Sequence, residues 1–299
     1  MSQPSPASPA GNRRAILALT CSMGLFAFND SLMKLATEGL PVSEIILLRG
    51  IIACTLLVVI LKFIGQFDLA SLFKHRIIYV RSLFEVLLTI SFVSALKNIP
   101  LGEVTAMTQA APILMSLWAA LVWKEQVSPG RWVAIMSGFA GVVIIARPDG
   151  NGLAPAMILA LAAALFAASR DLITRKVPSQ ISSLMVTFSS TLASGLGGLA
   201  LSPFEVWVTP DLTQWIYIAG AACISTSANF AIVLAYRGAD IGLVSPFRYT
   251  AVPFAVLLGL VIWGHMPDVW SFVGMAIVVL SGIYTIAGDR LFKLLRRAD

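Results

Sequence analysis

Two stretches of the chain decide its fold, LGEVTAMTQAAPILMSLWAALVW at residues 101–123 and IGLVSPFRYTAVPFAVLLGLVIW at residues 241–263. Aligned at an offset of 140 residues, they share Gly, Val, Ala, Leu and Trp at positions 102, 104, 111, 117 and 123 of the first stretch. The same offset relates Leu-Phe-Ala at 25–27 to Leu-Phe-Ala at 165–167. A constant offset of this kind indicates an internal repeat.

Each stretch is also long and apolar enough to cross a bilayer, which takes about 20 residues. Of the 299 residues, 58% are hydrophobic and 12% are charged, which is about half the charged fraction of a soluble domain. This composition excludes a secreted disulfide scaffold, a nucleic-acid binder and a disordered protein. The apolar residues come in long blocks with short polar breaks, so we expect an all-α integral membrane protein.

Ten transmembrane helices are predicted, five in each repeat. Because five is odd, the second repeat enters the membrane from the opposite side, which is the inverted-topology architecture of secondary transporters. The predicted spans are 15–37, 43–64, 77–97, 101–123, 130–147, 154–176, 180–201, 214–236, 241–263 and 269–288. The predicted domains are a disordered cytoplasmic tail at 1–14, the repeats at 15–147 and 154–288, and a basic cytoplasmic tail at 289–299.

Lysine and arginine predict the orientation of these spans. If the N-terminus is cytoplasmic, fourteen of these residues lie on the cytoplasmic side, against Lys34, Lys97 and Arg147 on the other. Positive charge gathers on the cytoplasmic side of membrane proteins, so both termini are expected there. The formal charge of +6 is therefore a topology signal.

Two prolines lie in the middle of equivalent spans, Pro112 in the fourth and Pro253 in the ninth. A proline has no N–H, so the carbonyls of Thr108 and Tyr249 lose their usual helical partners. Loosened backbone of this kind is tolerated where it is buried or lines a cavity. A packing kink is the alternative interpretation.

Charged and polar side chains inside the spans are the candidates for substrate binding, because a charge at mid-bilayer costs about 2.5–3.5 kcal/mol and usually pairs or lines a polar path. For Glu44, Arg49 and Glu103 the favoured interpretation is instead closed ion pairs that fix helix register, since each of these side chains can reach the interface. The predicted substrate-binding residues are Asn29, Asp30, Arg81, Glu85, Gln109, Arg170, Asp171, Arg248 and Tyr249.

Counting charges indicates the kind of substrate. Arg81 and Glu85 are four residues apart and can pair on one helix, which leaves Arg170 and Arg248 against Asp171. This excess of guanidinium suits a ligand with a carboxylate, and a zwitterion fits better than a neutral sugar or a lipophilic cation. The alternative is that Arg248 pairs with Asp171 and holds the ninth helix to the sixth.

Short motifs spread over both repeats carry a family resemblance. They are Asn29-Asp30, Glu44 through Arg49, Arg81, Pro112, Glu125 with Arg131-Trp132, Ala146-Arg147-Pro148, Arg170-Asp171 and Pro246-Phe247-Arg248-Tyr249. Through them the chain resembles the drug/metabolite transporter superfamily, of the ten-helix type with two EamA-like repeats. The last motif is similar to the S-adenosylmethionine-transporter branch, and the riboflavin-transporter branch is also similar. Gly264-His265 departs from the acidic residue common in the second repeat.

The expected function is therefore a secondary transporter of the bacterial inner membrane that exports a small polar or zwitterionic amino-acid-derived metabolite, such as an amino acid or an opine-type metallophore. The alternative is uptake or exchange of S-adenosylmethionine or riboflavin. An enzyme, a channel and a structural subunit are less favoured, because the sequence has buried charges and an inverted repeat but no local His, Cys and carboxylate cluster. No cofactor, metal or catalytic residue is expected. The expected partners are a small metabolite and the lipid bilayer, with a homodimer as a further alternative and no nucleic acid.

Overall fold

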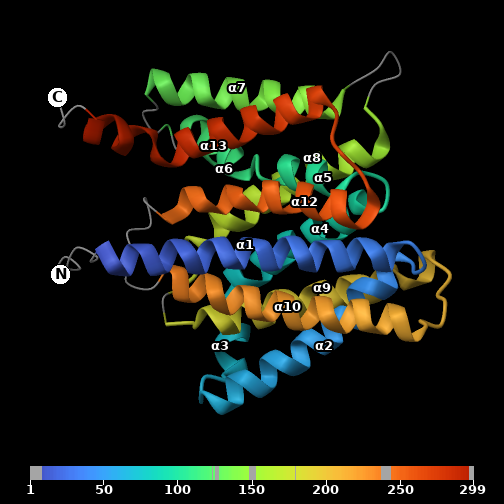
Figure 1. Cartoon of the computed structure of the whole chain (residues 1–299). Coiled ribbons are helices and arrows are strands. Elements are labelled where there is room, and N and C mark those ends of the chain that lie inside the picture. The colour runs from blue at the N-terminus through green and yellow to red at the C-terminus, as the bar shows by residue number, and fades with distance from the viewer. Residues whose placement is uncertain are drawn as a thin grey trace.

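The computed structural model describes residues 9–122, 124, 128–147, 153–178, 180–236 and 244–295, and the regular structure of this part is entirely helical (Figure 1). Predictions made for residues 1–8, Glu125, Pro148, and ranges 237–243 and 296–299 lie outside it.

The helices of the first repeat begin with α1 at the N-terminal end of the described chain. They are α1 Pro9–Thr37, α2 Val42–Phe63, α3 Leu69–Lys74, α4 Arg76–Leu96, α5 Leu101–Thr108, α6 Ala111–Leu121 and α7 Pro129–Ala146. The helices of the second repeat are α8 Pro155–Thr174, α9 Ser183–Leu201, η1 Ser202–Phe204, α10 Leu212–Tyr236, η2 Ser245–Thr250, α12 Ala251–Trp263 and α13 Val269–Leu295.

Nine of the ten predicted spans correspond to helices of the described chain that are long and apolar enough to cross a membrane. The fourth is divided into α5 and α6, because α5 ends at Thr108 and Pro112 lies in the first turn of α6. A first-turn proline needs no N–H partner, so the break falls where the sequence predicts loosened backbone. In the equivalent ninth span, the 3₁₀ turn η2 precedes α12.

The ends of the chain correct two predictions. Residues 9–14, predicted as part of a disordered tail, form the first turns of α1, and α13 continues to Leu295 instead of ending at residue 288. Both segments extend a long apolar helix, and Pro9 is compatible with a first helical position. The short helix α3 between α2 and α4 was not predicted, because six residues are too few to give a periodic signal.

The two repeats are built into each other rather than side by side. Helix α1 packs against α10, and its counterpart α8 packs against α4, while α2 packs against α9 and α7 against α13. Each pair joins one repeat to the other, and the pattern maps onto itself when the repeats are exchanged. The start of α1 and the end of α13 lie at one end of the bundle (Figure 1), which we call the terminal end; the opposite one is the far end.

Glycines allow two of these helix pairs to approach closely. A Cβ atom on Gly50 of α2 would lie 2.8 Å from the Cα atom of Gly195 in α9, and one on Gly141 of α7 would lie 2.8 Å from the carbonyl oxygen of Gly274 in α13. Small residues at a membrane helix interface let the backbones approach within packing distance. These contacts hold α2 directly against α9, and α7 directly against α13.

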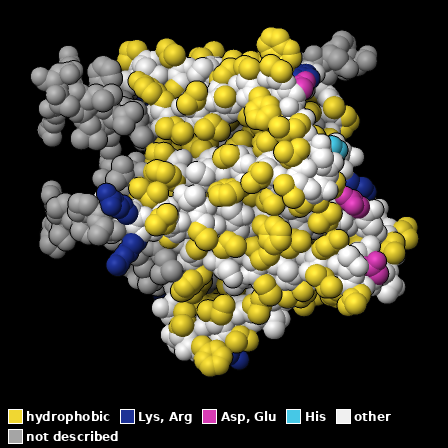
Figure 2. All heavy atoms as spheres, in the orientation of Figure 1, with side chains coloured by type: hydrophobic (Ala, Val, Ile, Leu, Met, Phe, Trp, Pro, Cys, Tyr) yellow, Lys and Arg dark blue, Asp and Glu magenta, His cyan; other side chains and the backbone are white. Residues whose placement is uncertain are grey.

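Apolar side chains cover the outside of the bundle. Hydrophobic groups spread over most of the face seen in Figure 2, and charged groups gather toward its margins. Phe63, Val133, Leu212 and Val261 are each at least 70% exposed. An apolar surface of this extent would aggregate in water, whereas lipid tails solvate it.

Candidate substrate-binding cavity

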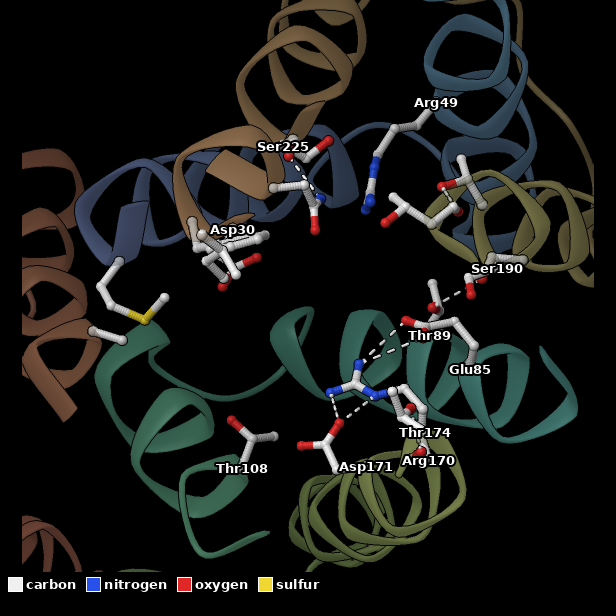
Figure 3. Close-up of a pocket in the computed structure, with 18 of the residues that line it drawn as sticks. Asp30, Arg49, Glu85, Thr89, Thr108, Arg170, Asp171, Thr174, Ser190 and Ser225 are labelled. Atoms are coloured by element: carbon white, nitrogen blue, oxygen red, sulfur yellow. Dashed lines mark hydrogen bonds and ion pairs between the residues drawn. The ribbon is translucent and has the colours of Figure 1, made fainter. Parts of the chain in front are cut away.

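A cavity of about 420 Å³ lies between the two repeats, and its described walls come from α1, α2, α4, α5, α8, α9, α10, η2 and α12 (Figure 3). The described lining includes no residue of α6, α7 or α13. Seven of the nine predicted substrate-binding residues line it, namely Asp30, Arg81, Glu85, Gln109, Arg170, Asp171 and Arg248.

The cavity lining runs from the far half of the bundle, where Ile46 lies one turn into α2, toward the terminal end. Its lining includes the centre of α1 around Phe26 and the last turn of α8 at Thr174. Helix α4 contributes residues from Arg81 onward, and α10 contributes residues as far as Ile232. Because α4 begins and α8 and α10 finish at the terminal end, the polar lining approaches that end of the bundle.

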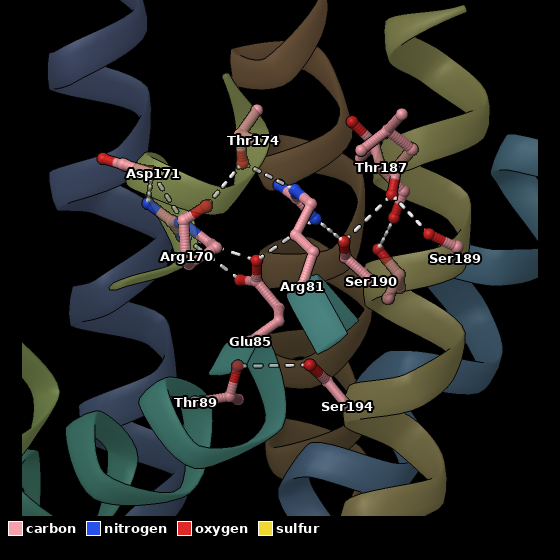
Figure 4. Close-up of polar contacts among 12 residues, drawn as sticks. Arg81, Glu85, Thr89, Arg170, Asp171, Thr174, Thr187, Ser189, Ser190 and Ser194 are labelled. Atoms are coloured by element: carbon pink, nitrogen blue, oxygen red, sulfur yellow. Dashed lines mark hydrogen bonds and ion pairs between the residues drawn. The ribbon is translucent and has the colours of Figure 1, made fainter. Parts of the chain in front are cut away.

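Five charged side chains form a chain of ion pairs along one wall (Figure 4). Arg81 Nη1 lies 3.7 Å from Glu85 Oε2, as their spacing predicts, and Glu85 Oε1 lies 3.4 Å from Arg170 Nη1. Arg170 Nη2 lies 2.8 Å from Asp171 Oδ1, and Asp171 Oδ2 lies 4.0 Å from Arg248 Nη1. Alternating charges offset one another's desolvation, so this chain can stay ionised within the membrane.

Arg81 also ties three helices together through hydroxyl groups. Its Nε donates to Thr174 Oγ1 at 2.8 Å on α8, and its Nη1 donates to the hydroxyl of Ser190 on α9. Thr174 in turn donates to the carbonyl of Arg170 at 2.7 Å. Arg81 of α4 is therefore held by both α8 and α9, which indicates that its role is partly structural.

Asp30 and Arg49 stand apart from this chain. Asp30 Oδ1 accepts a hydrogen bond from Asn29 Nδ2 at 2.8 Å. Arg49 projects from α2 into the cavity (Figure 3) and makes no hydrogen bond or ion pair with any residue that the structure describes. The closed ion pair predicted for Arg49 is not formed among the described residues, because span position gives the depth of a side chain but not its direction.

Hydroxyl groups cover the wall formed by α9. Thr187, Ser190, Thr191 and Ser194 lie at i, i+3, i+4 and i+7 and so share one face of the helix. Ser190 and Thr191 each donate to the carbonyl four residues earlier, at 2.9 Å. Their oxygens still have lone pairs that can accept from a ligand. This stripe was not predicted, although its spacing is visible in the sequence.

A hydrogen bond joins the two helix breaks. Gln109, in the turn between α5 and α6, donates through Nε2 to the carbonyl oxygen of Arg248 in η2 at 2.8 Å. Both residues line the cavity. The broken fourth and ninth spans thus meet at the site, where the freed backbone groups of one repeat can be reached by the other.

Two predicted residues do not line the cavity. Asn29 is buried and reaches the site only through its bond to Asp30. Tyr249 is 2% exposed and lies against Gly282 of α13, where a Cβ atom would clash with the ring. Because Tyr249 packs against α13 and does not line the cavity with Arg248, its predicted role in substrate binding is not supported by this conformation.

Polar contacts join helices at the far end of the bundle. Lys34 Nζ donates to the carbonyl of Leu96 and, at 2.7 Å, to that of Ile99. These hydrogen bonds cap the C-terminal end of α4. The same ammonium lies 5.7 Å from the ring centre of Trp263, whose Nε1 donates to Glu38 Oε1 at 2.6 Å. These contacts hold α1 against α4 and α12.

A second clamp at the far end joins α7 to α13. Arg147, just after α7, pairs with Asp268, which also accepts from the backbone N–H of Ser271 at 2.8 Å. The hydrogen bond from Arg147 and, to a smaller extent, the one from Ser271 lower the pKa of Asp268 to about 2. Asp268 therefore stays ionised and caps α13 at any physiological pH.

The sequence profile of the EamA-like transporter family matches residues 13–147 and 154–287, once for each repeat. The chain belongs to this family. Its two matches cover almost all of the described helices, and the cavity lies between them.

Named relatives transport different molecules in different directions. A riboflavin transporter of Vibrio cholerae is 33% identical over 185 residues, and the alignment covers 61% of each protein. An S-adenosylmethionine uptake transporter of Rickettsia prowazekii is 22% identical over 200 residues, which is 67% of this chain and 68% of the relative. A pseudopaline exporter of Pseudomonas aeruginosa is 21% identical over 271 residues, covering 90% of this chain and 94% of the exporter.

A solved structure with 20% identity superposes with a TM-score of 0.64 and covers 91% of this chain and 96% of its own. That likeness supports the fold. Among the described residues, no group of three His, Cys, Asp or Glu side chains lies close enough to hold a metal ion.

Proposed function

We propose that this EamA-like protein is a secondary transporter of the bacterial inner membrane that exports a small zwitterionic metabolite derived from an amino acid. The observation that carries this proposal is the charge of the cavity: four arginines and three carboxylates are among its described lining residues, Arg49, Arg81, Arg170, Arg248, Asp30, Glu85 and Asp171. A site with both signs of charge and a surplus of guanidinium complements a ligand with a carboxylate and an amine.

Alternating access supplies the mechanism in this proposal. The two interlocked repeats would rock about the cavity, opening it first to one side and then to the other. With both termini cytoplasmic, as the distribution of Lys and Arg supports, the terminal end faces the cytoplasm. The Lys34 and Arg147 clamps would then close the outer side. Residues 15–147 and 154–288 act as the two moving units, and residues 289–299 remain cytoplasmic.

Uptake is the second candidate, and the relatives support it. One takes up S-adenosylmethionine and another transports riboflavin. S-adenosylmethionine carries an amino-acid head group and suits the charged cavity. Riboflavin suits it less, because a flavin ring gains from aromatic stacking and Phe26 is the one aromatic side chain among the described lining residues.

Untargeted metabolite analysis of cells and medium, with and without the gene, tests function and direction together. An exporter predicts that a metabolite with a carboxylate and an amine accumulates inside cells that lack the gene and disappears from their medium. Uptake predicts the reverse. A plasmid copy should restore the pattern, and an Arg170→Gln copy should not. If no zwitterionic metabolite changes on either side, the proposed substrate class is wrong.

A further inference from the structure

The charged side chains of the cavity divide into two groups with different surroundings. One group is the chain from Arg81 to Arg248, in which each guanidinium lies within 4.0 Å of a carboxylate. The other group consists of Arg49 and Asp30, and no described ion pair includes either of them. A charge held in a membrane protein without a counter-ion lowers stability. Such a charge is retained where a ligand supplies the missing partner.

Arg49 and Asp30 are fixed on faces that point into the cavity. On α2, Ile46, Arg49 and Gly50 line it together, at the i, i+3 and i+4 spacing of one helix face. Gly50 packs on Gly195 of α9, so the backbone beneath Arg49 cannot rotate away. On α1, Asp30 lies one turn beyond Phe26 on the lining, and the amide of Asn29 orients its carboxylate.

Arg49 and Asp30 carry opposite charges but do not touch each other. Both line the cavity, yet no ion pair joins them in the described structure, and Figure 3 shows the two side chains on different helices around the cavity. An amino-acid head group has its carboxylate and ammonium on one carbon, so it offers a partner of opposite charge to each of these side chains. Guanidinium binds the carboxylate through two parallel hydrogen bonds, and a carboxylate accepts from an ammonium.

We propose that Arg49 and Asp30 form the head-group site, in which Arg49 binds the substrate's carboxylate and Asp30 binds its ammonium group. This inference rests on the proposed function and deepens it, since it separates two residues that select the substrate from five that hold the helices. The rest of the substrate then lies against the hydroxyl stripe of α9.

Binding of matched probes to the purified transporter tests the assignment. The probes are S-adenosylmethionine, its decarboxylated analogue, which lacks only the carboxylate, and riboflavin. The unaltered protein should bind S-adenosylmethionine about tenfold more tightly than the decarboxylated analogue, because a charge-assisted pair is lost with the carboxylate. Arg49→Gln should bind both equally weakly, and Arg49→Lys should keep part of the preference because it keeps charge but not the fork. Asp30→Asn should weaken both about equally.

The unfolding temperature of each variant distinguishes a substrate-binding role of Arg49 from a structural one. Because Arg49 lacks a described partner, Arg49→Gln should leave the unfolding temperature unchanged or raise it, while Glu85→Gln should lower it. Arg76→Gln, at the exposed start of α4, is the matched control and should keep the tenfold preference. The assignment is overturned if Arg49→Gln keeps that preference, if it unfolds as early as Glu85→Gln, or if the unaltered protein binds riboflavin alone or none of the probes. The metabolite analysis of cells and medium tests the proposed function separately, since a zwitterionic metabolite can change there even if Arg49→Gln keeps the tenfold preference.

Discussion

Arg170 lies between two carboxylates and is the central residue of the ion-pair chain. Its guanidinium is 3.4 Å from Glu85 and 2.8 Å from Asp171, and its side chain is 20% exposed. Lysine could not reproduce these contacts, because a single ammonium cannot present the planar fork that meets two carboxylates at once. A positive charge alone is therefore insufficient at this position.

Replacing Arg170 should reveal its structural contribution. Arg170→Gln leaves Glu85 and Asp171 without their shared partner, and breaking a buried pair costs about 3–5 kcal/mol; since the site borders a cavity, we expect about 3 kcal/mol. The measurement is the free energy of unfolding in detergent. Arg175→Gln, exposed after the end of α8, is the control and should change it by less than about 0.5 kcal/mol. Equal stability of the two variants would contradict a structural ion-pair chain.

The helix breaks are the elements on which the site depends. α5 ends at Thr108 and α6 begins at Ala111, and Gln109 between them reaches the carbonyl of Arg248 in the other repeat. In the proposed alternating-access mechanism, rocking of the repeats moves these two breaks together. A hydrogen bond between them is a direct means of coupling, since both are placed where backbone groups lack helical partners.

Shortening the side chain at this contact should slow transport. Gln109→Asn keeps the amide but removes one methylene, so it cannot span to Arg248 in the present backbone arrangement. Loss of one net hydrogen bond, about 1 kcal/mol, predicts a transport rate reduced roughly fivefold with a smaller change in apparent affinity. Rates in proteoliposomes over a range of substrate concentrations measure both quantities. A change confined to affinity would show instead that Gln109 binds substrate.

The positions of helices are predictable from sequence to a greater extent than the directions and partners of their side chains. Span length and apolar content are local properties, so nine spans match helices, and Pro112 marks the break in the fourth. The partner of a charge is a property of packing between distant segments. The i, i+4 pair Arg81–Glu85 was predictable for that reason, whereas the direction of Arg49 and the burial of Tyr249 against Gly282 were not.

At the scale of the whole molecule, two interlocked repeats enclose a polar cavity beneath an apolar exterior. The contacts around Lys34 and Arg147 join helices at the far end, while the cavity extends toward the terminal end. A transporter that alternates between two states must break the far-end contacts to open the other way, and so the cavity wall must become reachable from both sides in turn.

Accessibility of a single cysteine on the cavity wall tests this claim most directly. Thr191→Cys lies on the cavity face of α9, and the control Leu192→Cys lies on its outer face, where Leu192 is 41% exposed; Cys21, Cys54 and Cys223 are first replaced by alanine. A membrane-impermeant thiol reagent is applied to right-side-out and inside-out vesicles. Alternating access predicts that Thr191→Cys reacts in both preparations and Leu192→Cys in neither. Reaction of Thr191→Cys from one side only, under every condition, would contradict the account.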